Sequence, residues 1–169
     1  MDFDRSINVI DDKNPLTAVA EAANDYCRLI EQVKGNHPAE WLKRVESALL
    51  KLDAAVRRLA YQEPYRAYKL ASDLDARFES YLRLKRYLDH YDERSPEPDF
   101  RENVDLTYGN LSENLTDIYF EVRRGLASYE AGTTGEKSAQ RLWSNGYRNY
   151  WQQHLQEACK RLNLIHSAG

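Results

Sequence analysis

Apolar residues recur at steps of three and four along most of the chain, and this spacing predicts helices. The pattern is broadest in the last segment, Glu136 to His166, where it gives one long helix a strongly aromatic face. That face consists of Leu142, Trp143, Gly146, Tyr147, Tyr150, Trp151, His154, Leu155, Ala158, Cys159, Leu162 and Ile165. No segment shows a sustained alternation of apolar and polar residues, so the sequence predicts no strands.

Two earlier segments with the same period begin at residues that suit a helix start. Asn14 and Pro15 open the first segment, and Gly35 ends it. Pro38 opens the second segment, and Pro64 ends it. Along the second segment the apolar residues alternate steps of three and four without error, which is typical of a coiled-coil seam. They are Leu42, Val45, Leu49, Leu52, Val56 and Leu59.

The remaining segments have less uniform boundaries. The third helix follows a short turn near residues 65–71, and its apolar positions are Leu74, Phe78, Tyr81, Leu82, Leu84, Leu88 and Tyr91. Asn110 and Glu113 form a capping-type start for the fourth helix, and Gly132 ends it. Thr133 with Glu136 repeats the start signal for the last helix.

Together these segments predict an all-α protein, a single-domain antiparallel bundle of about five helices over residues 1–169. Residues 1–13 are a polar lead, and residues 92–109, which contain two prolines, are the one long irregular loop. A chain of 169 residues can bury a core of its own without disulfides or a structural metal.

The overall charge of the chain bears on whether its partner is a nucleic acid. The formal net charge is −3 and the pI is near 5.8, which argues against a protein dedicated to nucleic acid. A local basic excess between Arg57 and Arg86 is expected to be solvated or to pair within the protein. The sequence shows neither a signal peptide nor an apolar run near the ~18 residues of a membrane span. We therefore expect a cytoplasmic protein without a membrane partner, with Cys27 and Cys159 reduced and buried.

Three carboxylates form a row on the fourth helix, because Glu113, Asp117 and Glu121 recur at every fourth position. Like charges at this spacing repel each other, so the row needs a partner of opposite charge. Basic residues of a neighbouring helix are the commoner partner. The candidates are Arg83, Arg86, Arg141 and Arg148. The alternative is a site for a cation or for a substrate amine.

A single histidine, His154, lies in the aromatic face of the last helix, with Glu157 three positions on. Di-iron bundles use the opposite order, Glu-x-x-His, and this chain contains no such pair. A lone histidine on such a face is more commonly a core residue that hydrogen-bonds to a carboxylate or a carbonyl. Tyr147, Tyr150 and Trp151 either complete the core or line a pocket or partner groove.

A set of motifs in the C-terminal third carries a family resemblance. They are Asn114-Leu115-Thr116-Asp117-Ile118-Tyr119, Gly125-Leu126, Tyr129, Gly132, Trp143, Trp151-Gln152-Gln153-His154 and the closing Leu164-Ile165-His166. They resemble a bacterial domain-of-unknown-function family of small all-helical proteins, with a D-I-Y-x-D-L-x-x-G-L segment, an aromatic H-W-G-x-H segment and a final L-H. The resemblance implies a helical fold and no established activity. Tyr150 replaces the first histidine of that pattern, Gln152 the glycine and Glu121 the second aspartate, so a metal pair of two histidines would be missing here.

No catalytic motif stands out, so we assign no catalytic residue, no cofactor and no metal, and an enzyme is the less expected class. We expect a protein-interaction or self-associating module, whose partner is another protein or a second copy. The alternative is an enzyme that binds a metal or small ligand in a pocket between helices, using Asp117, Glu121 and His154. The further candidates for ligand binding are Tyr147, Tyr150 and Trp151.

Overall fold

The structure, a computed structural model, describes residues 14–33, 37–60, 73–94 and 109–168, and every regular element among them is helical. In chain order the elements are α2 (Pro15–Glu31), α3 (Pro38–Arg57), α4 (Leu74–Arg94), α5 (Leu111–Glu130), α6 (Thr133–Gly146), the π-helical turn η3 (Tyr147–Trp151) and α7 (Gln152–Ala168). Because α6, η3 and α7 run on without a break, five helices pack together in the described ranges. The predicted all-α bundle is confirmed.

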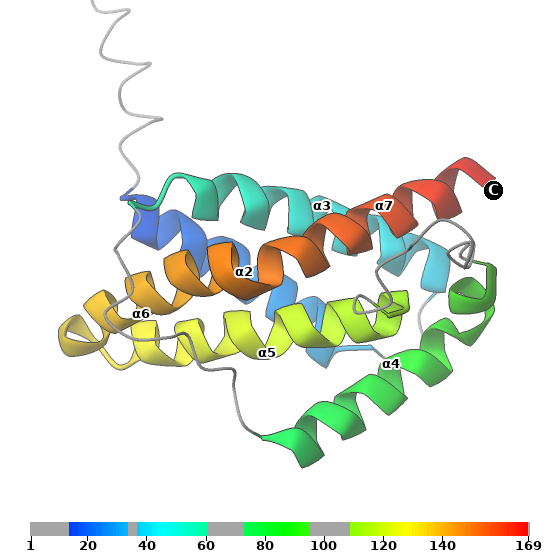
Figure 1. The fold of residues 1–169 in the computed structure, drawn as a ribbon, viewed down its shortest axis with the longest axis horizontal. Helices are drawn as coiled ribbons and strands as arrows, with labels where there is room; N and C mark the ends of the chain where they lie inside the picture. The colour runs from blue at the N-terminus through cyan, green and yellow to red at the C-terminus, as the bar shows by residue number, and fades with distance from the viewer. Residues whose placement is uncertain (1–13, 34–36, 61–72, 95–108, 169) are drawn as a thin grey trace, which may run out of the picture.

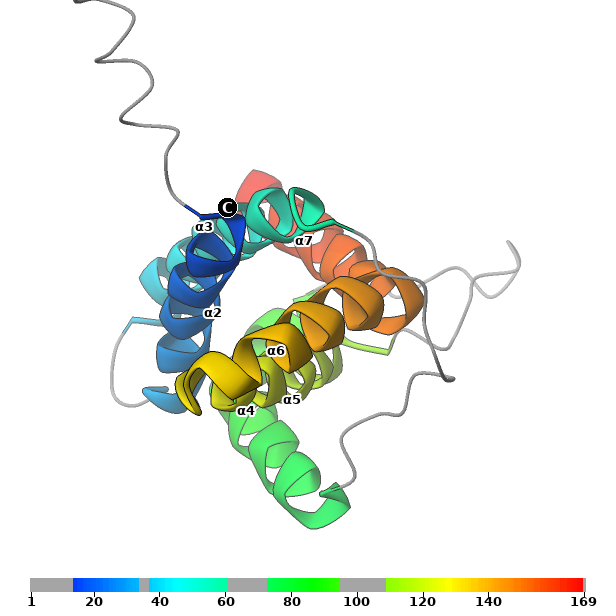
Figure 2. The same cartoon turned by 90° about the vertical axis from the view of Figure 1, so that its left-hand side faces the viewer.

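The central helix is α5, which contacts α2, α4, α6 and α7. Helix α3 packs on α2 and α7, so that four helices enclose the core, and α4 packs on α5 from outside. Figure 1 shows α2, α3, α5 and the last helix along the length of the molecule, with α4 crossing at one side. In Figure 2 α4 leaves the bundle at an angle, and one of its ends stands away from the other helices.

The helix ends follow the capping residues of the sequence, with one exception. Asn14 Oδ1 accepts a hydrogen bond from Leu16 N at 2.9 Å, and Asn110 Oδ1 accepts one from Glu113 N at 2.8 Å. Gly132 follows α5 with a φ of +97°, which favours glycine. The prediction that Thr133 caps the last helix is wrong, because Gly132 is the cap and Thr133 is already the first residue of α6.

Buried aromatic residues fasten α5 to its neighbours. Tyr26 of α2 is fully buried and donates its hydroxyl hydrogen to Leu115 O at 2.6 Å. Trp143 of α6 is fully buried and donates Nε1–H to Val122 O at 3.1 Å. The indole lies so close to α5 that a Cβ at Gly125 would approach its Nε1 to 2.2 Å. The seam predicted on α3 is buried along its whole length.

The apolar positions that the sequence places on α4 are buried only in part. Leu84 and Leu88 are fully buried. Leu74 and Phe78 are 73% and 59% exposed. The two sets lie on different sides of the helix, because seven apolar residues span more of its circumference than one neighbouring helix can cover. Helix α4 is therefore anchored by its later turns and open to solvent at its start.

The last helix differs from a regular α-helix at the π-helical turn η3. Trp143, Tyr147, Trp151 and Leu155 are all buried and spaced by four residues. Residues at this spacing drift around a helix with 3.6 residues per turn. The wider π turn corrects that drift and keeps all four side chains on the core side. The sequence predicted the face but not this turn.

Some predictions fall at the edge of the described residues or beyond them. The polar lead 1–13, the end at Gly35, the end at Pro64, the turn near residues 65–71 and most of the loop 92–109 lie outside the described ranges, although α4 continues past residue 92 to Arg94. Cys27 is buried, whereas Cys159, expected to be buried, is only partly so, and neither forms a disulfide. Among the described helices none has the length and apolar character needed to cross a bilayer.

Candidate functional site

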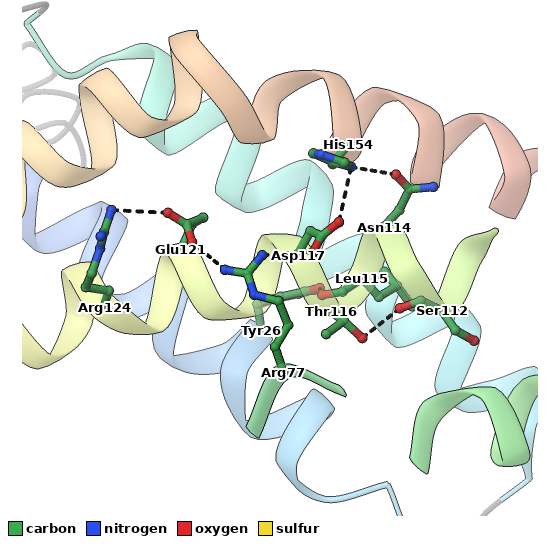
Figure 3. Close-up of polar contacts among 10 residues, drawn as sticks. All are labelled: Tyr26, Arg77, Ser112, Asn114, Leu115, Thr116, Asp117, Glu121, Arg124 and His154. Carbon is green, nitrogen blue, oxygen red and sulfur yellow. Dashed lines mark hydrogen bonds and ion pairs between the residues drawn. The ribbon is translucent and has the colours of Figure 1, made fainter. Parts of the chain in front are cut away.

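The predicted carboxylate row on α5 is divided by the structure. Glu113 is exposed at the first turn. The Asp117 side chain is 24% exposed and that of Glu121 is fully buried. Asp117 points toward His154 of α7 and Arg77 of α4, whereas Glu121 lies between Arg77 and Arg124 (Figure 3). A fully buried carboxylate requires a charged partner or several hydrogen bonds, because the interior solvates charge poorly.

Arg77 of α4 is the partner of both carboxylates. Its Nη1 lies 2.9 Å from Asp117 Oδ1 and its Nη2 lies 2.8 Å from Glu121 Oε2. Arg124, one turn further along α5, approaches the other oxygen of Glu121 at 3.1 Å. The Arg77 guanidinium also lies over the ring of Phe120, 5.3 Å from its centroid. The guanidinium group of Arg77 on α4 therefore lies at the edge of the core, next to α5.

The partners of Asp117 and Glu121 differ from the arginines that the sequence suggested. The side chains of Arg83, Arg86, Arg141 and Arg148 are all exposed. Arg77 and Arg124 pair with these two carboxylates instead, and neither was named as a partner of the row, although Arg77 belongs to the basic excess that was expected to be solvated or to pair within the protein. Arg124 could have been found, because it lies three residues after Glu121 on the same helix face. Arg77 could not, because its contact depends on how α4 is rotated against α5.

His154 is buried beside this ion pair and is hydrogen-bonded. Its Nδ1 lies 2.8 Å from Asn114 Oδ1 and 3.8 Å from Asp117 Oδ2. Asn114 donates its own Nδ2–H to Asn110 O at 2.9 Å, which turns Oδ1 toward the histidine. His154 Nδ1 therefore carries the proton of this hydrogen bond. Asn114 is a further member of the cluster that sequence reasoning missed, although it precedes Asp117 by three residues on the same face.

Burial sets the protonation of this cluster. It lowers the pKa of His154, and the positive charge of Arg77 acts in the same direction, whereas Asp117 opposes it. Burial also raises the pKa of Asp117, against the effects of His154 and Arg77. The pKa of Tyr150 is raised by burial and by Asp117. We therefore describe His154 as neutral near pH 7, donating from Nδ1.

The three aromatic candidates of the last helix lie in different surroundings. Tyr150 belongs to the cluster, with its ring centroid 4.8 Å from that of His154. Trp151 is fully buried in the core. Tyr147 faces α3, where its hydroxyl donates to Asp53 and accepts from Arg57 Nε at 3.1 Å. Burial and the bond to Asp53 raise the pKa of Tyr147 to about 12. The six ligand-binding candidates therefore do not form one site.

The chemistry available to the cluster is ion pairing. Asp117 lies beside His154, and Arg77 joins Asp117 to Glu121, so Arg77 supplies the positive charge that the two carboxylates need. Within the described ranges no three His, Cys, Asp or Glu side chains are grouped to hold a metal ion. The cluster therefore fastens α4 to α5, and ligand binding by these residues stays a prediction.

A second feature is the outer face of α4, which we define as Leu74, Phe78 and Leu82. These residues follow one another at steps of four and share one side of the helix. Leu74 and Phe78 are exposed and Leu82 is half-buried. Phe78 contacts the ring of Tyr81 at 6.3 Å between centroids. Two large apolar side chains exposed on adjacent turns distinguish this face from the isolated exposed residue Leu50 on α3.

Comparisons with known proteins agree with this fold. No curated protein matches the chain. The chain is similar in structure to protein BF1032 from Bacteroides fragilis, a structural-genomics target known from a crystal structure. The two share 18% sequence identity with a TM-score of 0.71, and the match covers 92% of this chain and 93% of that one. The model of the domain of unknown function DUF5063 matches residues 11–168. The resemblance seen in the sequence is thereby confirmed, and the chain belongs to the DUF5063 family.

Proposed function

We propose that the protein is a helical protein-interaction module and that the outer face of α4 is its contact surface. The observation that supports this proposal is the exposure of Leu74 and Phe78, at 73% and 59%, on adjacent turns of one helix. Exposing large apolar side chains to water is unfavourable, and contiguous exposed apolar residues commonly mark contact surfaces. An aromatic residue at the centre of such a face is a common energetic anchor.

The way α4 is held suits this role. Leu84 and Leu88 anchor its later turns in the core. Arg77, which lies between Leu74 and Phe78 in sequence, ties the first turns to Asp117 and Glu121. The contact surface is therefore presented on a helix that Arg77 holds within the exposed stretch and that Leu84 and Leu88 hold beyond it. Fixing a surface in advance reduces the conformational entropy lost on binding.

Site-specific photo-crosslinking tests this proposal. A photoreactive phenylalanine analogue at Phe78 is compared with the same analogue at Leu50, which is 56% exposed but lies alone on α3. Both variants are expressed in the organism of origin, irradiated and analysed by mass spectrometry. We expect defined adducts at position 78 and only background at position 50. Equal, diffuse labelling at the two positions would remove the support for α4 as a contact surface.

The same experiment separates the kinds of partner. Adducts between two copies of the chain and adducts with a different protein both support an interaction module. The two kinds of adduct differ in mass, so mass spectrometry shows whether the partner is a second copy of the chain or a different protein.

A further inference from the structure

The exposed charges of α4 are separated along its length. Asp75 and Glu79 lie in the first half, whereas Arg83 and Arg86 lie in the second half, and all four are exposed. None of these four forms an ion pair in the part of the chain that the structure describes. The spacing of Glu79 and Arg83 would allow an ion pair within the helix, yet the two side chains are not joined. Four charges are thus available to a partner.

These charges also lie on one flank of the outer face. With 3.6 residues per turn, Asp75, Glu79, Arg83 and Arg86 fall within about a quarter of the helix circumference, beside Leu74, Phe78 and Leu82. The opposite flank carries Arg77, Leu84 and Leu88, which face the bundle. From Leu74 to Leu82 the free surface of α4 is therefore an apolar stripe with one charged border, acidic at its start and basic toward its end. Lys85 continues the line of the stripe, with its Nζ over the ring of Tyr81.

From this arrangement we infer that the occupant of the outer face is the outer face of a second copy of the chain, packed antiparallel to the first. This inference rests on the proposed function and names its partner. The two copies are related by a two-fold axis that lies in the plane of contact and is perpendicular to both helices. This symmetry makes the helices antiparallel and places their charged borders on the same side of the contact. The acidic half of one border then faces the basic half of the other. In a parallel pair the two borders lie on opposite sides and gain nothing from each other.

The register follows from the sequence. The midpoint of Asp75 and Arg86 lies between Ser80 and Tyr81, and the midpoint of Glu79 and Arg83 is Tyr81, half a residue further on. One antiparallel alignment therefore places Asp75 opposite the second copy's arginine at position 86 and Glu79 within one residue, about 1.5 Å along the helix, of its arginine at position 83, each contact occurring twice by symmetry. Phe78 lies close to the centre of the same alignment, where an apolar anchor is best protected from water. Asp89 lies beyond the paired stretch, because its counterpart would precede Leu74.

The size of the contact sets the expected affinity. One pair of helices covers less surface than the roughly 1,600 Å² of a standard protein–protein interface. The dimer is therefore weak and depends on concentration, with dissociation in the micromolar to millimolar range. Exposed ion pairs contribute little individually, so their main effect is to select the antiparallel direction.

Sedimentation equilibrium of the full chain over a wide concentration range tests the inference. We expect a monomer–dimer equilibrium for the unmodified protein. Phe78→Ser should shift the dissociation constant upward by at least roughly tenfold, whereas Leu50→Ser, the matched change on α3, should leave it within about threefold. Circular dichroism confirms that each variant is folded. A protein that is monomeric at every concentration overturns the inference, and so does a dimer that Phe78→Ser does not weaken.

A charge exchange tests the direction of packing. Asp75→Arg and Arg86→Asp each place like charges opposite one another twice, and each should weaken the dimer roughly tenfold. The two changes together restore opposite charges, so the double variant should return to within about threefold of the original. Within one chain the two positions lie about 16 Å apart along the helix, too far to compensate each other directly. A double variant as weak as the single ones would overturn the antiparallel arrangement.

The inference and the proposed function fail in different ways. If Phe78 crosslinks to other proteins while the chain stays monomeric, the interaction module stands and the self-association is wrong. If position 78 gives no specific adduct and the protein is monomeric, both are wrong. Rescue by the charge exchange supports both, because a merely structural role for these exposed residues would not produce it.

Discussion

Glu121 illustrates how strongly one side chain in this bundle can depend on its partners. Its carboxylate has no exposure to solvent and contacts Arg77 at 2.8 Å and Arg124 at 3.1 Å. Removing one member of a buried pair leaves a desolvated charge without compensation. The energetic importance of this pair lies in the cost of breaking it rather than in a net gain from forming it.

We therefore expect Glu121→Gln to lower the free energy of unfolding by about 2–3 kcal/mol, because Gln cannot balance the charge of Arg77. This expected loss of stability is smaller than that for breaking a fully buried ion pair, because the Arg77 side chain is 14% exposed and solvent screens its charge. Urea denaturation measures the change. Glu130→Gln is the matched control, because Glu130 pairs with Arg123 at 3.7 Å on the surface. Equal effects of the two substitutions would contradict the role given to burial.

His154 predicts a pH dependence of stability. Burial lowers its pKa below the ordinary value of 6.5, so the unfolded chain binds a proton that the folded protein resists. Stability is therefore fully present above pH 6.5 and falls as the pH decreases from that value toward the folded pKa. The raised pKa of Asp117 acts in the opposite sense at more acidic pH, where the folded protein takes up the proton more readily.

The contribution of His154 is measured by comparing urea denaturation near pH 7.5 and near pH 5.5. The unmodified protein should lose more stability across this interval than the variant His154→Gln. His37→Gln is the control, because His37 is exposed at the start of α3 and its side chain makes no capping bond. If His154→Gln keeps the full loss of stability, the pH dependence arises elsewhere.

At the scale of elements, the approach of α6 to α5 depends on a missing side chain. A Cβ at Gly125 would meet the Trp143 indole at 2.2 Å from Nε1, and Trp143 donates to Val122 O. Gly125→Ala should therefore push the helices apart and lower the free energy of unfolding by about 1–3 kcal/mol, despite the higher helix propensity of Ala. Ser138→Ala on the exposed side of α6 should stay within about 0.5 kcal/mol. A Gly125→Ala protein as stable as the original would show that the indole can move at no cost.

Which element properties the sequence predicts depends on how local they are. The seam of α3 and the cap at Asn110 follow from residues within a few turns, and both were predicted correctly. The exposed start of α4 was not, because periodicity shows that residues share a side but not which side a neighbour covers. The π turn was not predicted for a similar reason, because it depends on the packing of Trp143 and Trp151 against other helices.

The candidate site shows the same limit at the level of contacts. The carboxylates Asp117 and Glu121 and the buried His154 were identified from spacing on single helices. Their meeting with Arg77 requires the rotation and placement of α4, which no local pattern carries. The sequence of one helix can therefore predict that its carboxylates need a basic partner. It cannot predict which residue of another helix is that partner.

At the scale of the whole molecule, the reactivity of the two cysteines can show whether the helices unfold together as one cooperative unit. Cys27 on α2 and Cys159 on α7 are both free thiols. Burial and the nearby Glu31 raise the pKa of Cys27 to about 12, and burial with Glu46 raises that of Cys159 to about 11. Because only the thiolate reacts, both should be inert in the folded protein at pH 8 and react only after the helices separate.

Since α2 and α7 both pack on α3 and on the central helix α5, opening either one breaks up the same core. We therefore expect a thiol reagent to modify Cys27 and Cys159 with the same dependence on urea concentration, corresponding to global unfolding. The variants Cys27→Ala and Cys159→Ala separate the two rates. By contrast, amide hydrogen exchange in the first turns of α4 should need less urea, because that end lies outside the four-helix core. Rapid modification of Cys159 without urea would show instead that α7 opens locally, and the bundle would not unfold as a single cooperative unit.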